Sequence, residues 1–136
     1  MFETFDHTAD LGLRIRAANL NDLFAEAARG LFHVMVGNLE TVRTVHDKVY
    51  RITADEPEFL LLDWLNELLY TFDTEHLLLC KFQVTVERLG LDAICQGESL
   101  NLKYHKLNHE VKAITYHNLT IRQEHTGWLA EVIVDI

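Results

Sequence analysis

Apolar and polar residues alternate one by one in several short stretches of the chain. Residues 11–17 read LGLRIRA, and residues 48–53 and 82–88 repeat this period of two. A period of two is typical of a strand that buries one of its faces. The same pattern, together with strand-favouring composition, predicts strands over residues 2–7, 93–102, 111–116, 119–124 and 128–134. Turns are predicted at residues 7–10, 89–92 and 126–127.

Two other segments show the period of a helix. Over residues 20–36 apolar residues recur every three or four positions, with Asn19 or Asn21 available to cap the start. A second helix is predicted from the segment DEPE at residues 55–58, where an acid, an early proline and further acids suit a helix start. Its apolar residues cover more than one stripe, so we expect it to lie between other elements.

The order of these elements is strands, helix, strand, helix and then a run of strands. This order predicts an α+β fold, with two main helices packed on a largely antiparallel or mixed β-sheet. The 136 residues fit a single domain, residues 1–136, and one proline and six glycines leave no linker-like segment.

Charge narrows the classes of partner. The formal net charge is −9, from 21 acidic and 12 basic residues. Proteins that bind nucleic acid on their own usually carry a basic stripe, so strong direct binding of nucleic acid is not expected. An acidic surface suits a basic protein partner or cations.

The sequence also predicts a cytoplasmic protein that does not enter a membrane. The first residues lack the basic and apolar regions of a signal peptide, and the apolar-rich stretch 59–72 is interrupted by polar residues. Cys80 and Cys95 lie in apolar stretches and form no C-x-x-C motif, which indicates reduced, buried thiols.

Motifs of the common enzyme classes are absent from the sequence. It contains no phosphate-binding glycine loop, dinucleotide fingerprint or nucleophile elbow. His105 and His109 are four residues apart, but the glutamate follows the second histidine and the segment is not helical. A zinc-hydrolase site needs the glutamate directly after the first histidine, on a helix, so zinc has little support.

Two aspartates stand at positions that raise the question of a cation site. Asp10 follows the predicted first bend, and Asp135 ends a mostly apolar final strand. Carboxylates at such places can ligate a hard cation through oxygen. Two other readings stay open: a solvent-exposed strand end for Asp135, and backbone hydrogen bonding within the turn for Asp10.

The segment HEVKAITYH, residues 109–117, combines strand-favouring residues with charged ones. Glu110 and Lys112 lie on one side of the expected strand. They are either a solvated pair, which would add little stability, or a pair directed at a partner protein. A third reading has Lys112 reaching Asp135.

Taken together, five segments resemble the archease family over nearly the whole chain, in the order and spacing of that family. They are HTADLGLRIRA, DLFAEAARGLFHVM, LLLDWLNELLYTFDTE, HEVKAITYH and VIVDI. The resemblance implies a small cytoplasmic α+β protein that assists the RtcB-type RNA ligase in tRNA splicing and RNA repair. In that role it promotes guanylylation of the ligase and multiple turnover, and it is not itself an enzyme.

The resemblance also implies a site. Archeases bind a divalent cation, calcium in crystals, through residues that correspond to Asp10, Asp135 and Ile136 here. Magnesium and manganese are the alternatives in the cell. Residues that would meet the ligase are Asp22, Glu26 and Lys112.

Two other functions compete with ligase activation. Some family members are linked to the specificity of a tRNA methyltransferase, and a chaperone-like role has been assigned to the family. A metal-dependent hydrolase would combine Asp10 and Asp135 with His7 as general base. The middle segment around residues 39–47 is shorter than in common archaeal forms, which leaves Asp47 and Asp55 as unassigned acids.

Overall fold

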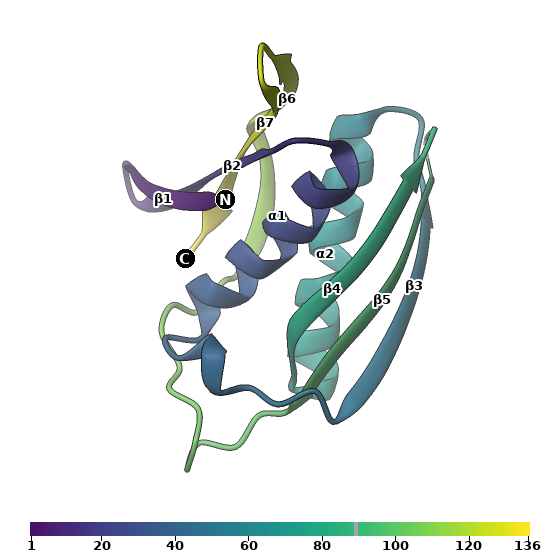
Figure 1. Cartoon of the computed structure of the whole chain (residues 1–136). Coiled ribbons are helices and arrows are strands. Elements are labelled where there is room, and N and C mark those ends of the chain that lie inside the picture. Colours follow the sequence, from purple (N-terminus) through teal and green to yellow (C-terminus); the bar gives the residue numbers. More distant parts are fainter. Residues whose placement is uncertain (89) are drawn as a thin grey trace.

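The computed structural model describes residues 1–88 and 90–136. Two helices lie between two antiparallel β-sheets (Figure 1). The four-stranded sheet has the order β1 (Phe2–His7), β2 (Asp10–Ala17), β7 (Gly127–Asp135), β6 (Ala113–Glu124). The three-stranded sheet has the order β3 (His46–Thr53), β5 (Gly90–Ser99), β4 (Leu77–Glu87). The first two and last two strands therefore form one sheet, and the three strands between them in the sequence form the other.

Helix α1 (Leu20–Met35) begins where the sequence predicts a cap. The Asn19 side chain accepts a hydrogen bond from the backbone N–H of Asp22 at 2.9 Å. One face of the helix packs on β2 and another on β4, so α1 contacts both sheets. This position explains why Leu23, Phe24, Leu31 and Phe32 are all fully buried.

Helix α2 (Pro57–Glu75) packs against β6 and, more lightly, against the three-stranded sheet. Pro57 occupies the first turn as expected, but the predicted acidic cap is wrong, because the Glu56 side chain makes no capping hydrogen bond. Trp64 is fully buried and donates its indole N–H to the Phe24 carbonyl of α1 at 3.0 Å. The two helices are thus joined by a polar contact inside the apolar core.

The α+β class and both helices are confirmed, and three expectations about strands are wrong. The strands form two sheets and not one. The two strands expected at 111–116 and 119–124 are a single strand, β6, whose pairing with β7 is irregular between Thr115 and Thr120. Asn118 adopts a left-handed conformation there, with φ of 57°, which asparagine tolerates better than most residues. Strand β5 begins at Gly90 inside the expected turn 89–92, of which Leu89 lies outside the described residues.

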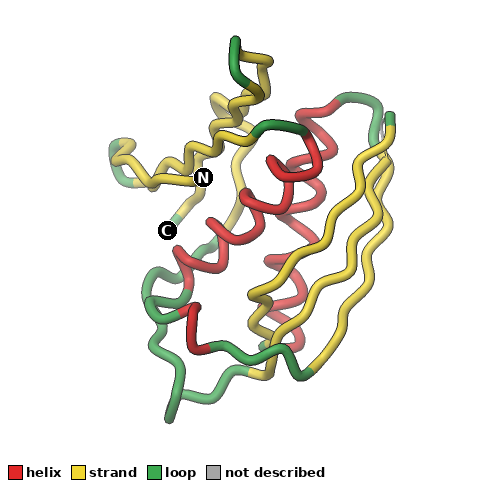
Figure 2. Tube along the Cα trace, viewed as in Figure 1, coloured by secondary structure: helices red, strands yellow, loops and turns green. Residues whose placement is uncertain are grey.

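A long connection without regular secondary structure, residues 100–112, links β5 to β6 (Figure 2). It replaces the end of the strand expected over 93–102 and the start of the one expected over 111–116. Among the helices described, none is long and apolar enough to cross a membrane.

Candidate functional site

The predicted cation ligands at the two ends of the chain lie on neighbouring strands. Strands β2 and β7 are antiparallel, with Leu11 opposite Val134. One further step in this register places Asp10 opposite Asp135. Directly opposed residues of an antiparallel pair have Cα atoms about 4.5–5.5 Å apart and side chains on the same face. The fold therefore brings the two aspartates together.

The end of β7 is held from its other side as well. The backbone N–H of Lys112 donates to the Asp135 carbonyl at 2.7 Å, and Ala113 pairs with Asp135 in β6. Asp135 and Ile136 are both half-buried, and Ile136 packs against the core. The reading of this strand end as frayed and solvent-exposed is not supported, because it has a paired neighbour on each side.

The HTAD segment forms a tight hairpin turn. His7 pairs with Asp10 across the turn, which leaves Thr8 and Ala9 as its two loop residues. Thr8 has a φ of 54°, in the left-handed region that a β-branched residue rarely adopts. This backbone conformation lets the chain reverse just before Asp10.

His7, the general base of the hydrolase reading, faces another histidine. Its ring centroid lies 5.8 Å from that of His117, edge to face. Its Nδ1 atom is buried and has no hydrogen-bond partner among the described residues. The ring lines a pocket of about 360 Å³ that also includes Arg14, Glu131 and Thr120. The pocket places the His7 ring beside an ion pair, since Arg14 Nε donates to Glu131 at 2.6 Å.

The donor atoms at the end of β7 have the chemistry of a hard-cation site. Two carboxylates and the main-chain oxygens of Ile136 offer oxygen alone, which suits calcium, magnesium or manganese and not zinc. Within residues 1–88 and 90–136, no three side chains of His, Cys, Asp or Glu gather in a metal-binding arrangement. A cation held by Asp10 and Asp135 would therefore also need the main-chain oxygens of Ile136, which is the third residue of the predicted ligand set.

His105, the first histidine of the pair considered for zinc, has a structural role. His105 is buried, its Nδ1 accepts from the backbone N–H of Asn101 at 2.9 Å, and its Nε2 lies 3.2 Å from Glu98 Oε2. Both ring nitrogens are occupied, so neither is free to ligate a metal.

The three predicted partner-contact residues do not form one surface. Lys112 lies beside Asp135 at the end of β7, and its backbone N–H donates to the Asp135 carbonyl. Its exposed side chain makes no ion pair with any described residue. Glu26 binds the N-terminal ammonium at 3.0 Å and Arg29 at 2.9 Å, and Asp22 lies one helical turn away. These two acids line a pocket with Ala17. Ala17 and Asp10 lie at the two ends of β2. At about 3.3 Å per strand residue they are about 23 Å apart.

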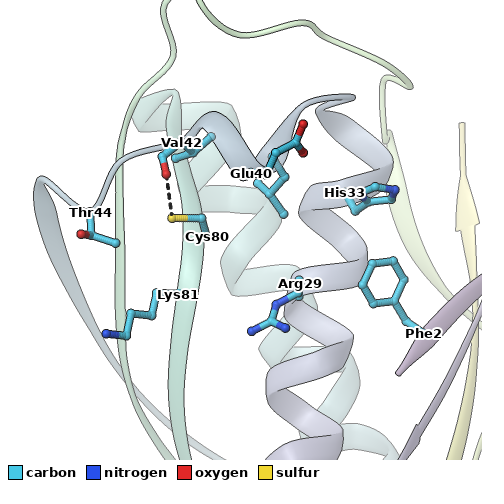
Figure 3. A pocket seen from close by; sticks show the side chains of 9 residues that line it. Phe2, Arg29, His33, Glu40, Val42, Thr44, Cys80 and Lys81 are labelled. Atoms are coloured by element: carbon cyan, nitrogen blue, oxygen red, sulfur yellow. Dashed lines mark hydrogen bonds between the residues drawn. The ribbon is translucent and has the colours of Figure 1, made fainter.

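A further pocket, of about 470 Å³, opens between α1 and β4 (Figure 3). Arg29 and His33 extend from α1, and Lys81 and Cys80 from β4. The Cys80 thiol donates to the Val42 carbonyl at 3.4 Å, and burial raises its pKa, so the sulfur stays protonated and poorly nucleophilic. None of the predicted site residues lines this pocket, and no motif in the sequence points to it.

Comparison with known proteins settles the family. The model of the Archease protein family matches residues 2–136. The chain belongs to the archease family. Protein archease of Methanosarcina mazei is 33% identical over 140 residues, covering 99% of this chain and 95% of the relative. Protein archease of Methanothermobacter thermautotrophicus is 36% identical over 139 residues, covering 99% and 98%.

Solved structures agree with this archease's fold. The solution structure of Methanobacterium thermoautotrophicum protein 1598 superposes with a TM-score of 0.88 at 36% identity, covering 99% of this chain and 98% of that one. A crystal structure from Thermotoga maritima, described as an archease and possible chaperone, gives a TM-score of 0.67 at 20% identity, covering 100% and 98%. The second likeness concerns the fold alone. The resemblance in the sequence and the α+β class are thereby confirmed.

Proposed function

We propose that this archease activates an RtcB-type RNA ligase in the cytoplasm, promoting guanylylation and repeated turnover during tRNA splicing and RNA repair. In this role it is a protein cofactor and not an enzyme. Membership of the archease family supports the proposal. The adjacency of Asp10 and Asp135 supports the part of it that concerns a bound divalent cation.

The proposed role of the site begins with the two carboxylates. Asp10 and Asp135, with the main-chain oxygens of Ile136, would hold a divalent cation at the end of β7. When bound, that cation supplies positive charge that can neutralise phosphate oxygens. Pairing of β7 with both β2 and β6 fixes the position of these oxygens before any partner arrives.

Charge supports the choice of partner. A ligase that binds GTP and RNA needs a basic active-site mouth, and this chain has a net charge of −9. Opposite charges raise the rate of encounter and orient the partners before contact. Lys112 lies beside Asp135, and its exposed side chain forms no ion pair with the residues that the structure describes, so it can contact an acidic group or a phosphate of the complex.

The deciding experiment measures multiple-turnover ligation by the ligase with and without this archease. Asp10→Asn and Asp135→Asn variants are expected to lose stimulation while remaining folded, and Asp73→Asn, an exposed carboxylate on α2, is the matched control. Full stimulation by both site variants would remove the cation from the mechanism. No stimulation by the wild-type chain would remove the ligase role itself.

A second role is favoured by the description of the Thermotoga maritima archease as a possible chaperone. In this alternative the protein stabilises a tRNA methyltransferase or changes its specificity. Affinity capture from a cytosolic extract separates the two roles, because recovery of a methyltransferase with unchanged ligation would favour the alternative. Hydrolysis of phosphoesters by the isolated protein, which we do not expect, would instead favour the hydrolase reading.

A further inference from the structure

The connection between β5 and β6, residues 100–112, is unusually long for a segment without regular secondary structure. Such loops in compact domains are usually functional or disordered. This one is ordered by hydrogen bonds along its length and projects from the lower end of the molecule (Figure 1). Its length and its order together indicate a binding loop.

The anchors of the loop are backbone and buried groups. The Asn38 side chain makes two hydrogen bonds with the loop. It donates to the Tyr104 carbonyl at 2.9 Å and accepts from the Lys106 N–H at 2.8 Å. The N–H groups of Asn108 and His109 donate to carbonyls at the end of α1 at 2.8 and 3.0 Å. These contacts fix the path of the loop and leave the side chains at its tip exposed, with the Lys103 ammonium 5.5 Å from the centroid of the Tyr104 ring.

These exposed side chains are apolar and basic. Leu102, Tyr104 and Leu107 are 71%, 59% and 53% exposed. Lys103 and Lys106 have no carboxylate within salt-bridge distance among the described residues. No acidic residue occurs between positions 99 and 109, although the whole chain has a net charge of −9. The loop is therefore locally positive in a protein whose overall charge is negative.

Beside the tip lies a pocket of about 430 Å³, lined by Tyr104, Arg43, Thr41 and Glu98. The Arg43 guanidinium is held by two hydrogen bonds to Glu98 Oε1, at 3.3 and 3.1 Å, and its side chain remains 75% exposed. An aromatic ring and a guanidinium are the two planar groups on which nucleobases stack. The charge of Glu98 is balanced by Arg43, so it does not oppose an anionic ligand at the mouth.

We propose that this loop binds a short single-stranded segment of nucleic acid. One base would stack on Tyr104 at the pocket beside Arg43, and Lys103 and Lys106 would each meet a phosphate of the flanking backbone. The contact is small, and the overall negative charge weakens it, so it serves to guide a strand and not to capture one from dilute solution. This inference does not depend on the role of the cation site.

An acidic protein segment is the other ligand that lysines could attract. Lysine is depleted at protein interfaces, whereas lysine beside an exposed aromatic ring is typical of surfaces that bind single strands. A carboxylate would use the two lysines and leave the planar groups at the pocket without a role. The observations therefore favour nucleic acid.

The test is fluorescence anisotropy with a labelled oligouridylate at low ionic strength, over a series of salt concentrations. Tyr104→Ala is expected to weaken binding by about 5-fold or more, because stacking of one base is lost. Lys103→Ala/Lys106→Ala is expected to reduce the slope of log K against log salt by about 1.4, at about 0.7 per phosphate. Tyr70→Ala, which removes an exposed tyrosine on α2, and Lys81→Ala, which removes an exposed lysine that forms no ion pair within residues 1–88 and 90–136, are the controls and should change nothing.

Folding does not confound this test, because the Tyr104 side chain takes no part in the anchors, and circular dichroism of each variant verifies it. Absence of binding by the wild-type chain at low salt would overturn the proposal. Equal effects of Tyr104→Ala and Tyr70→Ala would do the same. Displacement of the oligonucleotide by oligoglutamate as readily as by unlabelled RNA would reassign the loop to an acidic protein partner.

Discussion

His105 donates its Nε2 hydrogen to Glu98 across 3.2 Å, and this contact joins the long loop to the end of β5. The tautomer follows from the other ring nitrogen, because Nδ1 accepts the N–H of Asn101. The same carboxylate oxygen, Glu98 Oε2, also accepts the backbone N–H of Arg43 at 2.7 Å. One carboxylate at the end of β5 therefore holds the long loop and the distant segment around Arg43 together.

Replacement of this carboxylate should destabilise the protein. Glu98→Gln keeps the shape but removes the charge that strengthens four hydrogen bonds, so we expect the free energy of unfolding to fall by about 2 kcal/mol. Urea denaturation measures it. Glu40→Gln, at an exposed position, is the matched control and should stay within about 0.5 kcal/mol of wild type. A loss no greater than that of the control would mean that the loop is held without Glu98.

The same carboxylate makes stability depend on pH. The backbone N–H of Arg43, followed by the Arg43 and His105 side chains, lowers the pKa of Glu98 below its ordinary value of 4.5, against the opposing effect of burial. A depressed pKa in the folded state adds stability that is present above 4.5 and is lost as pH falls through the folded value. Unfolding free energies of wild type and Glu98→Gln should therefore converge in acid. Parallel curves down to the lowest pH would contradict this assignment.

Gly97 in β5 should tolerate no side chain. A Cβ atom there would overlap the Leu78 carbonyl of β4, next to the register shift between Leu79 and Lys81. We expect Gly97→Ala to cost about 1–3 kcal/mol of stability through backbone displacement. Gly37→Ala is the control, since its Cβ would meet the Lys106 carbonyl oxygen only at an ordinary 3.8 Å. Thermal unfolding of the two variants should separate them, and equal melting temperatures would show that β4 can shift freely.

Local sequence patterns predicted the helices and strands better than they predicted which strands pair with one another. Alternation in LGLRIRA gives the strand and its buried face, but a period of two says nothing about which strand lies beside it. The pairing of β2 with β7 joins opposite ends of the chain, so the adjacency of Asp10 and Asp135 that follows from its register was expected from family resemblance and not from periodicity. The division into two sheets is also set by nonlocal packing around the helices.

The error at residues 100–112 has a different cause. Val111 is buried and Lys112 exposed, as alternation requires, yet β6 begins only at Ala113. Before that point the backbone N–H groups of Asn108 and His109 donate to α1 and not to a strand. Only at Lys112 does a backbone N–H of this segment donate to β7. The change of backbone partner from the helix end to the strand cannot be read from a pattern of side chains.

Thr8 offers a site for stabilisation. Its φ of 54° is costly for a β-branched residue, whereas asparagine adopts the left-handed region more easily. Thr8→Asn should therefore raise the free energy of unfolding by about 1 kcal/mol. Thr44→Asn, at an exposed position with ordinary φ, should bring no gain in the same denaturant titration. A destabilised Thr8→Asn protein would mean that the threonine side chain contributes to the turn in a way that outweighs its backbone strain.

Because Asp10 and Asp135 are adjacent, we expect Asp135→Asn to have opposite effects on stability with and without a cation. In chelator, two like charges on directly opposed strand positions repel, so Asp135→Asn should be more stable than wild type by about 0.2–1 kcal/mol. With calcium, wild type should gain about 2.7 kcal/mol at a concentration of about 100 times the dissociation constant, and Asp135→Asn should gain little. The order of the two melting temperatures should thus reverse when calcium is added, while Asp73→Asn follows wild type in both conditions. If calcium, magnesium and manganese all leave wild type unchanged, the two carboxylates do not hold a cation in the isolated protein.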